Sequence, residues 1–295
     1  MDNETMGKCS GLYYHDAWYS LYTNDLTEMV PPSTAISEIS SFAARAKSTT
    51  HLVLNVANLL PTMMSTEAIM RFAFCPQDFE ASAHAAQRRF LVSWSKREFT
   101  DGDAQLAEKA ADLFEHYYDI VKIQSNLSNP EHPRDPMFNL SLPQTPGELW
   151  VAKVVRGVAE CTMSAIGGVS DRQEAVARAK SVICDENAGS SNRKLLKLCA
   201  DISGAQCISP LESLLQEAAL LLSVLVTSRS RGAHYFQASF LLQCTIYAAL
   251  WRANIATAQA ILAFAANTAW SLAAVRSNVS LALSEYERIF KIQRE

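Results

Sequence analysis

The fold is decided by the C-terminal stretch, residues 211–295, LESLLQEAALLLSVLVTSRSRGAHYFQASFLLQCTIYAALWRANIATAQAILAFAANTAWSLAAVRSNVSLALSEYERIFKIQRE. This stretch contains no proline and a single glycine, Gly232, and these are the two residue types that most often interrupt a helix. The simplest interpretation is a helix to about residue 227, a turn at SRSRG, a helix over 233–251 and a final helix to the end of the sequence.

Two helix starts strengthen this interpretation. Thr145-Pro146-Gly147-Glu148 and Ser209-Pro210-Leu211-Glu212 each combine a capping hydroxyl, a proline at the first helical position and a glutamate that can reach back to the cap. Gly167-Gly168 is expected to end the first of these helices. We find no convincing strand and no tandem repeat in the sequence. It therefore predicts an all-α fold, a multi-helix bundle with long Ala-rich C-terminal helices.

Helical spacing also extends through residues 1–124, which we expect to form an N-terminal helical region. In LYYHDAWYSLY, residues 12–22, the aromatic side chains of Tyr14, Trp18 and Tyr22 recur every four positions. On a helix, side chains at this spacing share one face. We interpret the segment as a helix that docks its rings on the core, and a ligand platform or partner surface is the less favoured alternative.

The next segments are interpreted as helices separated by prolines and turns. HLVLNVANLL, residues 51–60, is expected to be a helix that ends at Pro61, because proline lacks the amide donor that a helix interior needs. Further helices are expected up to about residue 98 and over 104–124, with the turn Thr100-Asp101-Gly102-Asp103 between them.

Residues 125–146 differ in character from the rest of the chain. They hold five of its ten prolines, so they cannot form a regular helix. We interpret them as a Pro-rich linker or a packed loop, followed by a C-terminal helical bundle over residues 147–295. The alternative is one continuous domain.

Composition excludes a disordered chain. Hydrophobic residues make up 49% of the sequence and charged residues 19%, which is an ordinary balance for a globular protein. The charge is uneven: residues 1–146 carry a net charge of −7 and residues 147–295 a net charge of +3. Halves of opposite charge would suit head-to-tail association or a charged partner.

Two apolar stretches raise the question of a membrane. Residues 232–251 and 253–275 carry no charged side chain when His234 is neutral, and both are long enough to cross a bilayer. Each also contains several polar side chains, which lipid cannot satisfy. We therefore expect interior helices of a protein that does not enter a membrane.

The cysteines favour a reducing compartment. All seven are scattered, and none forms a C-x-x-C pair. The N-terminal MDNETMGKCS is polar and lacks the apolar segment of a secretory signal. These features predict a cytoplasmic protein.

Familiar catalytic and cofactor motifs are absent from the sequence. It contains no phosphate loop, no dinucleotide-binding glycine pattern, no H-E-x-x-H, no G-x-S-x-G and no paired E-x-x-H. We therefore predict no catalytic residue, no cofactor and no metal ligand.

One acidic helix face resembles a site. Asp112, Glu115, His116 and Asp119 recur along a predicted helix, where they could hold a divalent cation or perform acid–base chemistry. Lysines and a further glutamate lie on the same helix, and a solvated surface helix with mixed charges has the same pattern. The second interpretation is favoured.

A basic segment is the next candidate. Cations interleaved with aromatic rings can bind phosphates and stack on bases. Because Glu98 follows and this half of the chain is acidic, a folded surface is favoured and nucleic acid is not expected as a partner. The segment comprises Arg88, Arg89, Phe90, Trp94, Lys96 and Arg97.

The turn at SRSRG offers the last candidate. Arg229 and Arg231, followed by His234, could contact an anion or an acidic partner at the junction of two helices. Capping of the preceding helix by the same side chains explains them equally well.

These observations together predict a non-enzymatic helical protein-protein interaction or assembly protein, with a protein partner or self-association. The alternatives are an enzyme with an unfamiliar helical site near Asp112–Asp119 and a nucleic-acid-coating protein that uses Arg88–Arg97. Metal binding would distinguish the first alternative, and salt-dependent nucleic-acid binding the second.

Overall fold

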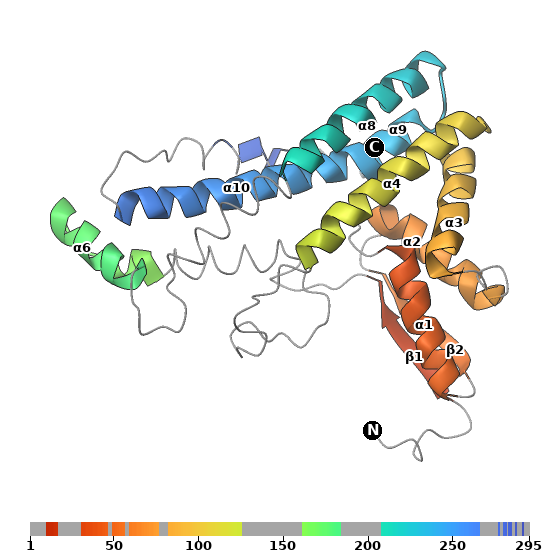
Figure 1. Ribbon diagram of the computed structural model, residues 1–295, viewed down its shortest axis with the longest axis horizontal. Helices are drawn as coiled ribbons and strands as arrows, with labels where there is room; N and C mark the ends of the chain where they lie inside the picture. Colours follow the sequence, from red (N-terminus) through yellow and green to blue (C-terminus); the bar gives the residue numbers. More distant parts are fainter. Residues whose placement is uncertain are drawn as a thin grey trace. The chain divides into compact units, whose positions relative to one another are not determined.

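The computed structural model describes most of the chain. It covers residues 10–16, 31–46, 49–56, 59–76, 82–125, 161–183 and 208–265, with isolated positions between 277 and 291. Helices dominate these residues (Figure 1), which confirms the predicted all-α, multi-helix class.

The helices are α1 (Pro32–Ala46), α2 (Leu59–Phe74), α3 (Ala83–Glu98), α4 (Ala104–Ser125), α6 (Arg172–Ile183), α8 (Ser209–Thr227), α9 (Ala233–Phe236) and α10 (Leu242–Ala265). A π-helical turn, Gln237–Leu241, joins α9 to α10. Two short strands, β1 (Ser10–His15) and β2 (Thr49–Asn55), complete the described elements.

The chain divides into two compact units. Unit 1 contains residues 1–118 and 217–243, and unit 2 contains residues 119–216 and 244–295. The predicted linker, residues 125–146, lies outside the described residues apart from Ser125, the last residue of α4. The predicted boundary at this linker therefore stays a prediction.

The two strands correct the sequence analysis, which expected helices in both places. β1 and β2 pair in parallel, with Ser10 opposite Thr49 and His15 opposite Asn55. They form a two-stranded sheet with α1 in the connection between them (Figure 1). The expected aromatic helix face fails because Tyr14 lies on a strand; Trp18 and Tyr22 lie outside the described residues.

The sheet forms because one of its faces has a core to cover. Leu12 and Tyr14 on β1, and Leu52 and Leu54 on β2, alternate along their strands and so point to the same face. They pack with Phe72 against a buried cluster formed by Ala35, Ile39 and Ile69. The cluster comes from α1, which precedes β2, and from α2, which follows it. Packing against this cluster stabilises β2 as a strand, although its local sequence is also compatible with a helix.

Pro61 marks the beginning of a helix and not its end. It is the third residue of α2, where the amide that proline lacks would have no partner inside the helix. The other N-terminal helix bounds agree with the sequence analysis: α3 ends at Glu98, and α4 runs from Ala104 to Ser125.

An aromatic cluster forms the core of unit 1. Phe99, at the end of α3, is fully buried. Its ring lies 4.8 Å from that of Trp94, 6.1 Å from that of Phe114 on α4 and 5.2 Å from that of Phe236 on α9. Each such pair adds about 0.5–1.5 kcal/mol beyond the apolar area that it buries.

Of the two predicted helix starts, the one at Ser209 can be compared with the structure, and the one at Thr145-Pro146-Gly147-Glu148 lies outside the described residues. α8 begins at Ser209, as expected, and the helix before Gly167 ends there. The expected break near Arg252 is wrong, because α10 runs through it to Ala265. Within unit 2, Arg252 forms an ion pair with Glu212 at 2.7 Å, and Trp251 is fully buried.

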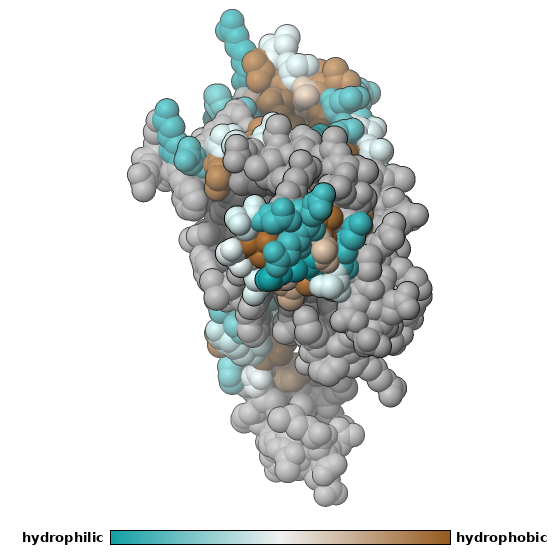
Figure 2. Space-filling model, turned by 90° about the vertical axis from the view of Figure 1, so that its left-hand side faces the viewer, coloured by the Kyte–Doolittle hydropathy of each residue, from teal (hydrophilic) through white to brown (hydrophobic). Residues whose placement is uncertain are grey.

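Helix α6 of unit 2 has a narrow buried face and an exposed charged face. Val176 and Ala179 are buried, whereas Glu174 and Arg178 are exposed and form an ion pair at 2.6 Å. Figure 2 shows hydrophilic side chains gathered on part of the described surface.

Among the described residues, α8 is long and apolar enough to cross a membrane. Its mean hydropathy is 1.3, and 28% of the window that gives this value is buried. Length and composition do not distinguish a membrane span from a core helix. The expectation that the protein does not enter a membrane therefore stays a prediction.

Two turns of unit 1 meet although they are far apart in the sequence. The Ser230 hydroxyl donates to the carbonyl oxygen of Phe99, and the Arg231 amide donates to Asp101 Oδ2 at 3.0 Å. Gly232 permits this approach, because a Cβ atom there would lie 2.0 Å from the Glu98 carbonyl oxygen. The contact connects the α3–α4 turn to the α8–α9 turn.

We predict that Gly232→Ala destabilises unit 1. The added methyl group must displace backbone atoms of Glu98 and Phe99, and overpacking of this kind costs about 1–3 kcal/mol. The measurement is the midpoint of urea unfolding, followed by the near-ultraviolet circular dichroism of the aromatic cluster. Gly167→Ala is the matched control, because its Cβ would meet only ordinary contacts at 3.4 Å. Equal midpoints for the two variants would contradict the prediction.

Candidate functional site

The candidate site begins at the carboxyl end of β1. Leu12, Tyr14 and Asp16 are spaced by two residues, so their side chains lie on the same face of the extended chain. Asp16 directly follows the strand, and its amide donates to the carbonyl oxygen of Asn55 at 3.0 Å. Parallel strands present their carboxyl ends at one edge, which is where α/β proteins place functional groups.

Asp16 is a buried carboxyl with two unlike oxygens. Asp16 is only 8% exposed to solvent. Its Oδ2 accepts hydrogen bonds from Ser65 Oγ at 2.6 Å and from Thr66 Oγ1 at 3.2 Å, both on α2. Its Oδ1 is buried and has no hydrogen-bond partner among the described residues.

This environment favours the protonated form of Asp16. Burial raises the pKa of the carboxyl above its ordinary value, because water no longer stabilises the charge. The hydrogen bonds from Ser65 and Thr66 lower the pKa, but they offset burial only in part. A proton on Oδ1 would give that oxygen a hydrogen to donate, while Oδ2 keeps its two donors.

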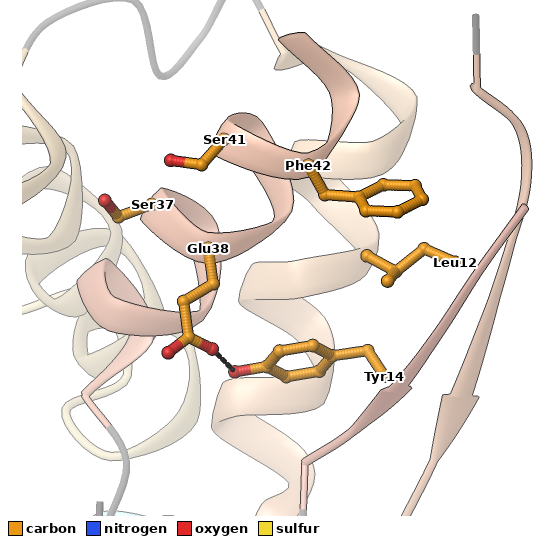
Figure 3. Close-up of a pocket in the computed structure, with 6 residues that line it drawn as sticks. All are labelled: Leu12, Tyr14, Ser37, Glu38, Ser41 and Phe42. Carbon is orange, nitrogen blue, oxygen red and sulfur yellow. Dashed lines mark hydrogen bonds between the residues drawn. The ribbon is translucent and has the colours of Figure 1, made fainter. Parts of the chain in front are cut away.

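A pocket of about 410 Å³ lies between β1 and α1, next to the same strand face. Leu12, Tyr14 and Phe42 lie between the strand and α1, and the hydroxyls of Ser37 and Ser41 point from α1 away from these three side chains (Figure 3). The pocket is lined by Leu12, Tyr14, Ser37, Glu38, Ser41 and Phe42.

Tyr14 lines the pocket and interacts electrostatically with Asp16. Its hydroxyl donates to Glu38 Oε2 at 3.1 Å across the pocket (Figure 3). Burial is the largest cause that raises the pKa of Tyr14, and the charges of Glu38 and Asp16 raise it further. The phenol therefore stays protonated and can keep donating to Glu38.

The arrangement can perform acid–base chemistry with two carboxyl groups in different surroundings. Asp16 is buried, and burial raises the pKa of its carboxyl group, whereas Glu38 lies exposed on α1. Pairs of carboxyl groups whose environments differ in this way assign one group as acid and the other as base or nucleophile.

Residues 1–126 match the family model of glycosyl hydrolase family 115. The matched segment contains Tyr14, Asp16, Glu38, Ser65 and the whole of the pocket. No curated protein matches the chain, and no solved structure matches it.

The family match corrects the function that the sequence analysis predicted. A non-enzymatic interaction or assembly protein, whose main property is protein binding, conflicts with similarity to a family of glycosyl hydrolases. The prediction was wrong because it depended on short motifs, whereas the similarity extends over more than a hundred residues that include both strands. Cytoplasmic localisation and a protein partner stay predictions.

The acidic face of α4 forms ion pairs with an arginine of α3. Arg88 on α3 pairs with Glu108 at 2.5 Å, with Asp112 at 2.6 Å and with Glu115 at 2.9 Å. No three metal-ligating side chains come together among the described residues. These ion pairs agree with the mixed-charge surface helix that the sequence favoured for this part of α4, and a site at Asp112, Glu115, His116 and Asp119 stays the less favoured alternative.

Two cations of the basic segment, Arg88 and Arg97, pair with neighbouring carboxylates. Besides the pairs of Arg88, Arg97 binds Glu67 and Glu98, each at 2.6 Å. Phe90 and Trp94 are buried in the core, so their rings are not available for stacking on bases. The segment Arg88–Arg97 is thus a folded surface with ion pairs, as the sequence analysis favoured.

The turn residues at 229–234 lie on the surface. Arg229, Arg231 and His234 are all exposed, and Arg229 has a positive φ of 57°. The Arg229 amide donates to the carbonyl oxygen of Val226 at 3.0 Å, and the Arg231 amide donates to Asp101 Oδ2 at 3.0 Å. A role of the three side chains in contacting an anion or a partner stays a prediction.

The sequence analysis missed Asp16 and Glu38. Asp16 lies inside the segment that was interpreted as an aromatic helix, where it had no special position. The available signal was alternation: Leu12, Tyr14 and Asp16 share a period of two, and Leu52 and Leu54 repeat it in the next strand. Asp directly after such a strand is the position at which parallel sheets carry functional groups.

We predict that Asp16→Asn changes the pH dependence of stability. Burial raises the folded-state pKa of Asp16 above its ordinary value of 3.8, so the folded chain holds this proton more tightly than the unfolded chain. The stabilisation is complete below about pH 4 and is lost as the pH rises through the folded-state pKa. The variant keeps the shape but does not ionise, so its free energy of unfolding should decline less as the pH rises above about pH 4.

Urea unfolding at a series of pH values measures this difference. Asp112→Asn is the control, because the carboxylate of Asp112 is exposed and forms a surface ion pair. The same pH dependence in wild type and Asp16→Asn would contradict the prediction.

Proposed function

We propose that the chain takes part in the hydrolysis of glycosidic bonds, with Asp16 as the general acid and Glu38 as the second carboxylate. The observation that carries this proposal is the buried carboxyl of Asp16, whose Oδ1 has no described partner, inside the segment similar to a glycosyl hydrolase family. Glycoside hydrolysis generally uses a pair of carboxyl groups, one of which has a raised pKa.

Asp16 would protonate the leaving group. As the bond between the anomeric carbon and the glycosidic oxygen breaks, the proton on Asp16 Oδ1 moves to that oxygen and the carboxyl becomes a carboxylate. The electron pair of the broken bond stays on the leaving oxygen, and positive charge develops on the sugar ring. Ser65 and Thr66 would stabilise the carboxylate that forms, because both donate to Oδ2.

Glu38 would complete the reaction from the pocket. It can remove a proton from the attacking water, or it can itself bond to the anomeric carbon before water releases the sugar. The Tyr14 hydroxyl, which donates to Glu38 Oε2, would hold the carboxylate in position for either route. The anomer of the first product distinguishes the two routes.

The pocket has the composition that a sugar requires. Tyr14 and Phe42 offer aromatic rings for the apolar face of a sugar ring, and Ser37 and Ser41 offer hydroxyls for its polar groups. Small-molecule sites combine an apolar lining with a few polar groups in the same way.

We predict that Asp16→Asn and Glu38→Gln each lower hydrolysis by roughly 10²- to 10⁴-fold, the usual contribution of an acid or base. The probes are 4-nitrophenyl glycosides of both anomeric configurations and the corresponding unactivated oligosaccharides. Because nitrophenolate leaves without protonation, Asp16→Asn should impair the oligosaccharides far more than the nitrophenyl substrates. Glu38→Gln should impair both.

Asp112→Asn is the matched control and should retain wild-type activity, because this carboxylate pairs with Arg88 on the outer side of α4. Hydrolysis of no probe by the wild-type chain would contradict the proposal. So would equal losses for the two substrate types in Asp16→Asn, because a general acid acts mainly on poor leaving groups.

A further inference from the structure

We propose that the hydroxyls of Ser65 and Thr66 are positioning groups that hold the Asp16 carboxyl by Oδ2 and leave Oδ1 as the oxygen that carries and transfers the proton. This inference rests on the function proposed above and adds the residues that orient its acid. It assigns a role to two hydroxyl groups on α2 that do not themselves touch the reacting atoms.

The geometry of the two hydrogen bonds supports this assignment. Ser65 Oγ lies 2.6 Å from Asp16 Oδ2, and Thr66 Oγ1 lies 3.2 Å from the same oxygen. Neither hydroxyl is recorded in contact with Oδ1, which is buried without a described partner. A carboxylic acid holds its proton on the oxygen that accepts fewer hydrogen bonds, so the proton belongs on Oδ1.

The burial of Ser65 limits the acceptors to which its hydroxyl can donate. The residue is 1% exposed, so water does not compete for its proton. Its Oγ also lies 3.1 Å from the carbonyl oxygen of Thr62, and a hydroxyl has a single proton to donate. The bond to Asp16 is the shorter of the two, so the Ser65 proton is assigned to Asp16 Oδ2.

The charged and titratable surroundings of Asp16 are few among the described contacts. On its own strand, Tyr14 interacts with it electrostatically, and on α1, Glu38 is reached through the Tyr14 hydroxyl. β2 contributes the backbone carbonyl of Asn55. The contacts recorded from α2 are the neutral hydroxyls of Ser65 and Thr66. These two groups are therefore the main polar influence on the acid.

The test compares Ser65→Ala, Thr66→Val and Thr66→Ser in the full chain. The pKa of Asp16 is measured by carbon-13 NMR titration of its carboxyl group, which requires no activity. In parallel, the pH dependence of kcat/KM is measured with an unactivated oligosaccharide. Loss of a donor destabilises the carboxylate, so Ser65→Ala should raise the pKa of Asp16 and move the basic limb of the pH profile upward.

Thr66 provides the internal comparison. Thr66→Val should cause a smaller upward shift, because its bond is longer, and Thr66→Ser should restore the wild-type value because it keeps the hydroxyl. The Thr66 pair decides the question if Ser65→Ala does not fold, since Thr66 is only half-buried.

The outcomes separate this inference from the proposed function. Hydrolysis with an unchanged Asp16 pKa in Ser65→Ala and Thr66→Val overturns the positioning role and leaves the function standing. If the Asp16 pKa shifts in these variants but the chain hydrolyses no glycoside, the positioning role of the two hydroxyls is supported and the proposed function is overturned. Equal shifts in Thr66→Val and Thr66→Ser also overturn the inference, because the hydroxyl would then not be responsible.

Discussion

Burial of the Asp16 carboxyl at the end of β1 is the constraint on which the candidate site depends. In water, a carboxyl group is readily charged, but at this position the surrounding protein replaces the water and penalises the charge. The two hydroxyls from α2 satisfy one oxygen and leave the other without a described partner. A fold that served stability alone would have little reason to keep an acid in this environment.

The extended backbone of β1 determines which side chains of the candidate site share one face. Alternation along β1 sets Leu12, Tyr14 and Asp16 on one face, so that apolar packing, a phenol and an acid succeed each other over five residues. α1 adds Glu38 to this row through its bond with Tyr14. The same face contacts the buried cluster of Ala35, Ile39 and Ile69, so the packing that stabilises the sheet also fixes the site.

The sequence allowed the helices to be predicted better than the site. Local signals such as the Ser209-Pro210 start and the Asp103 cap, whose carboxylate accepts from the amides of Gln105 and Leu106, act within one turn and can be recognised without a fold. The strands depend on pairing between Ser10 and Thr49, and the acid on a contact 49 residues away. Such distant partners leave little trace in a short window, which is why LYYHD was interpreted as helical.

The meeting of the two turns through Gly232 has a consequence for the order of folding. Unit 1 is built from residues 1–118 and 217–243, and the Ser230–Phe99 hydrogen bond joins positions 131 residues apart. During synthesis, the strands and the first helices emerge long before α9, whose Phe236 completes the aromatic cluster around Phe99. The ring of Phe99 therefore lacks this partner until more than a hundred further residues have been translated, an interval of roughly 6 seconds or longer at ordinary rates of elongation. This interval is when the nascent chain would most need a chaperone.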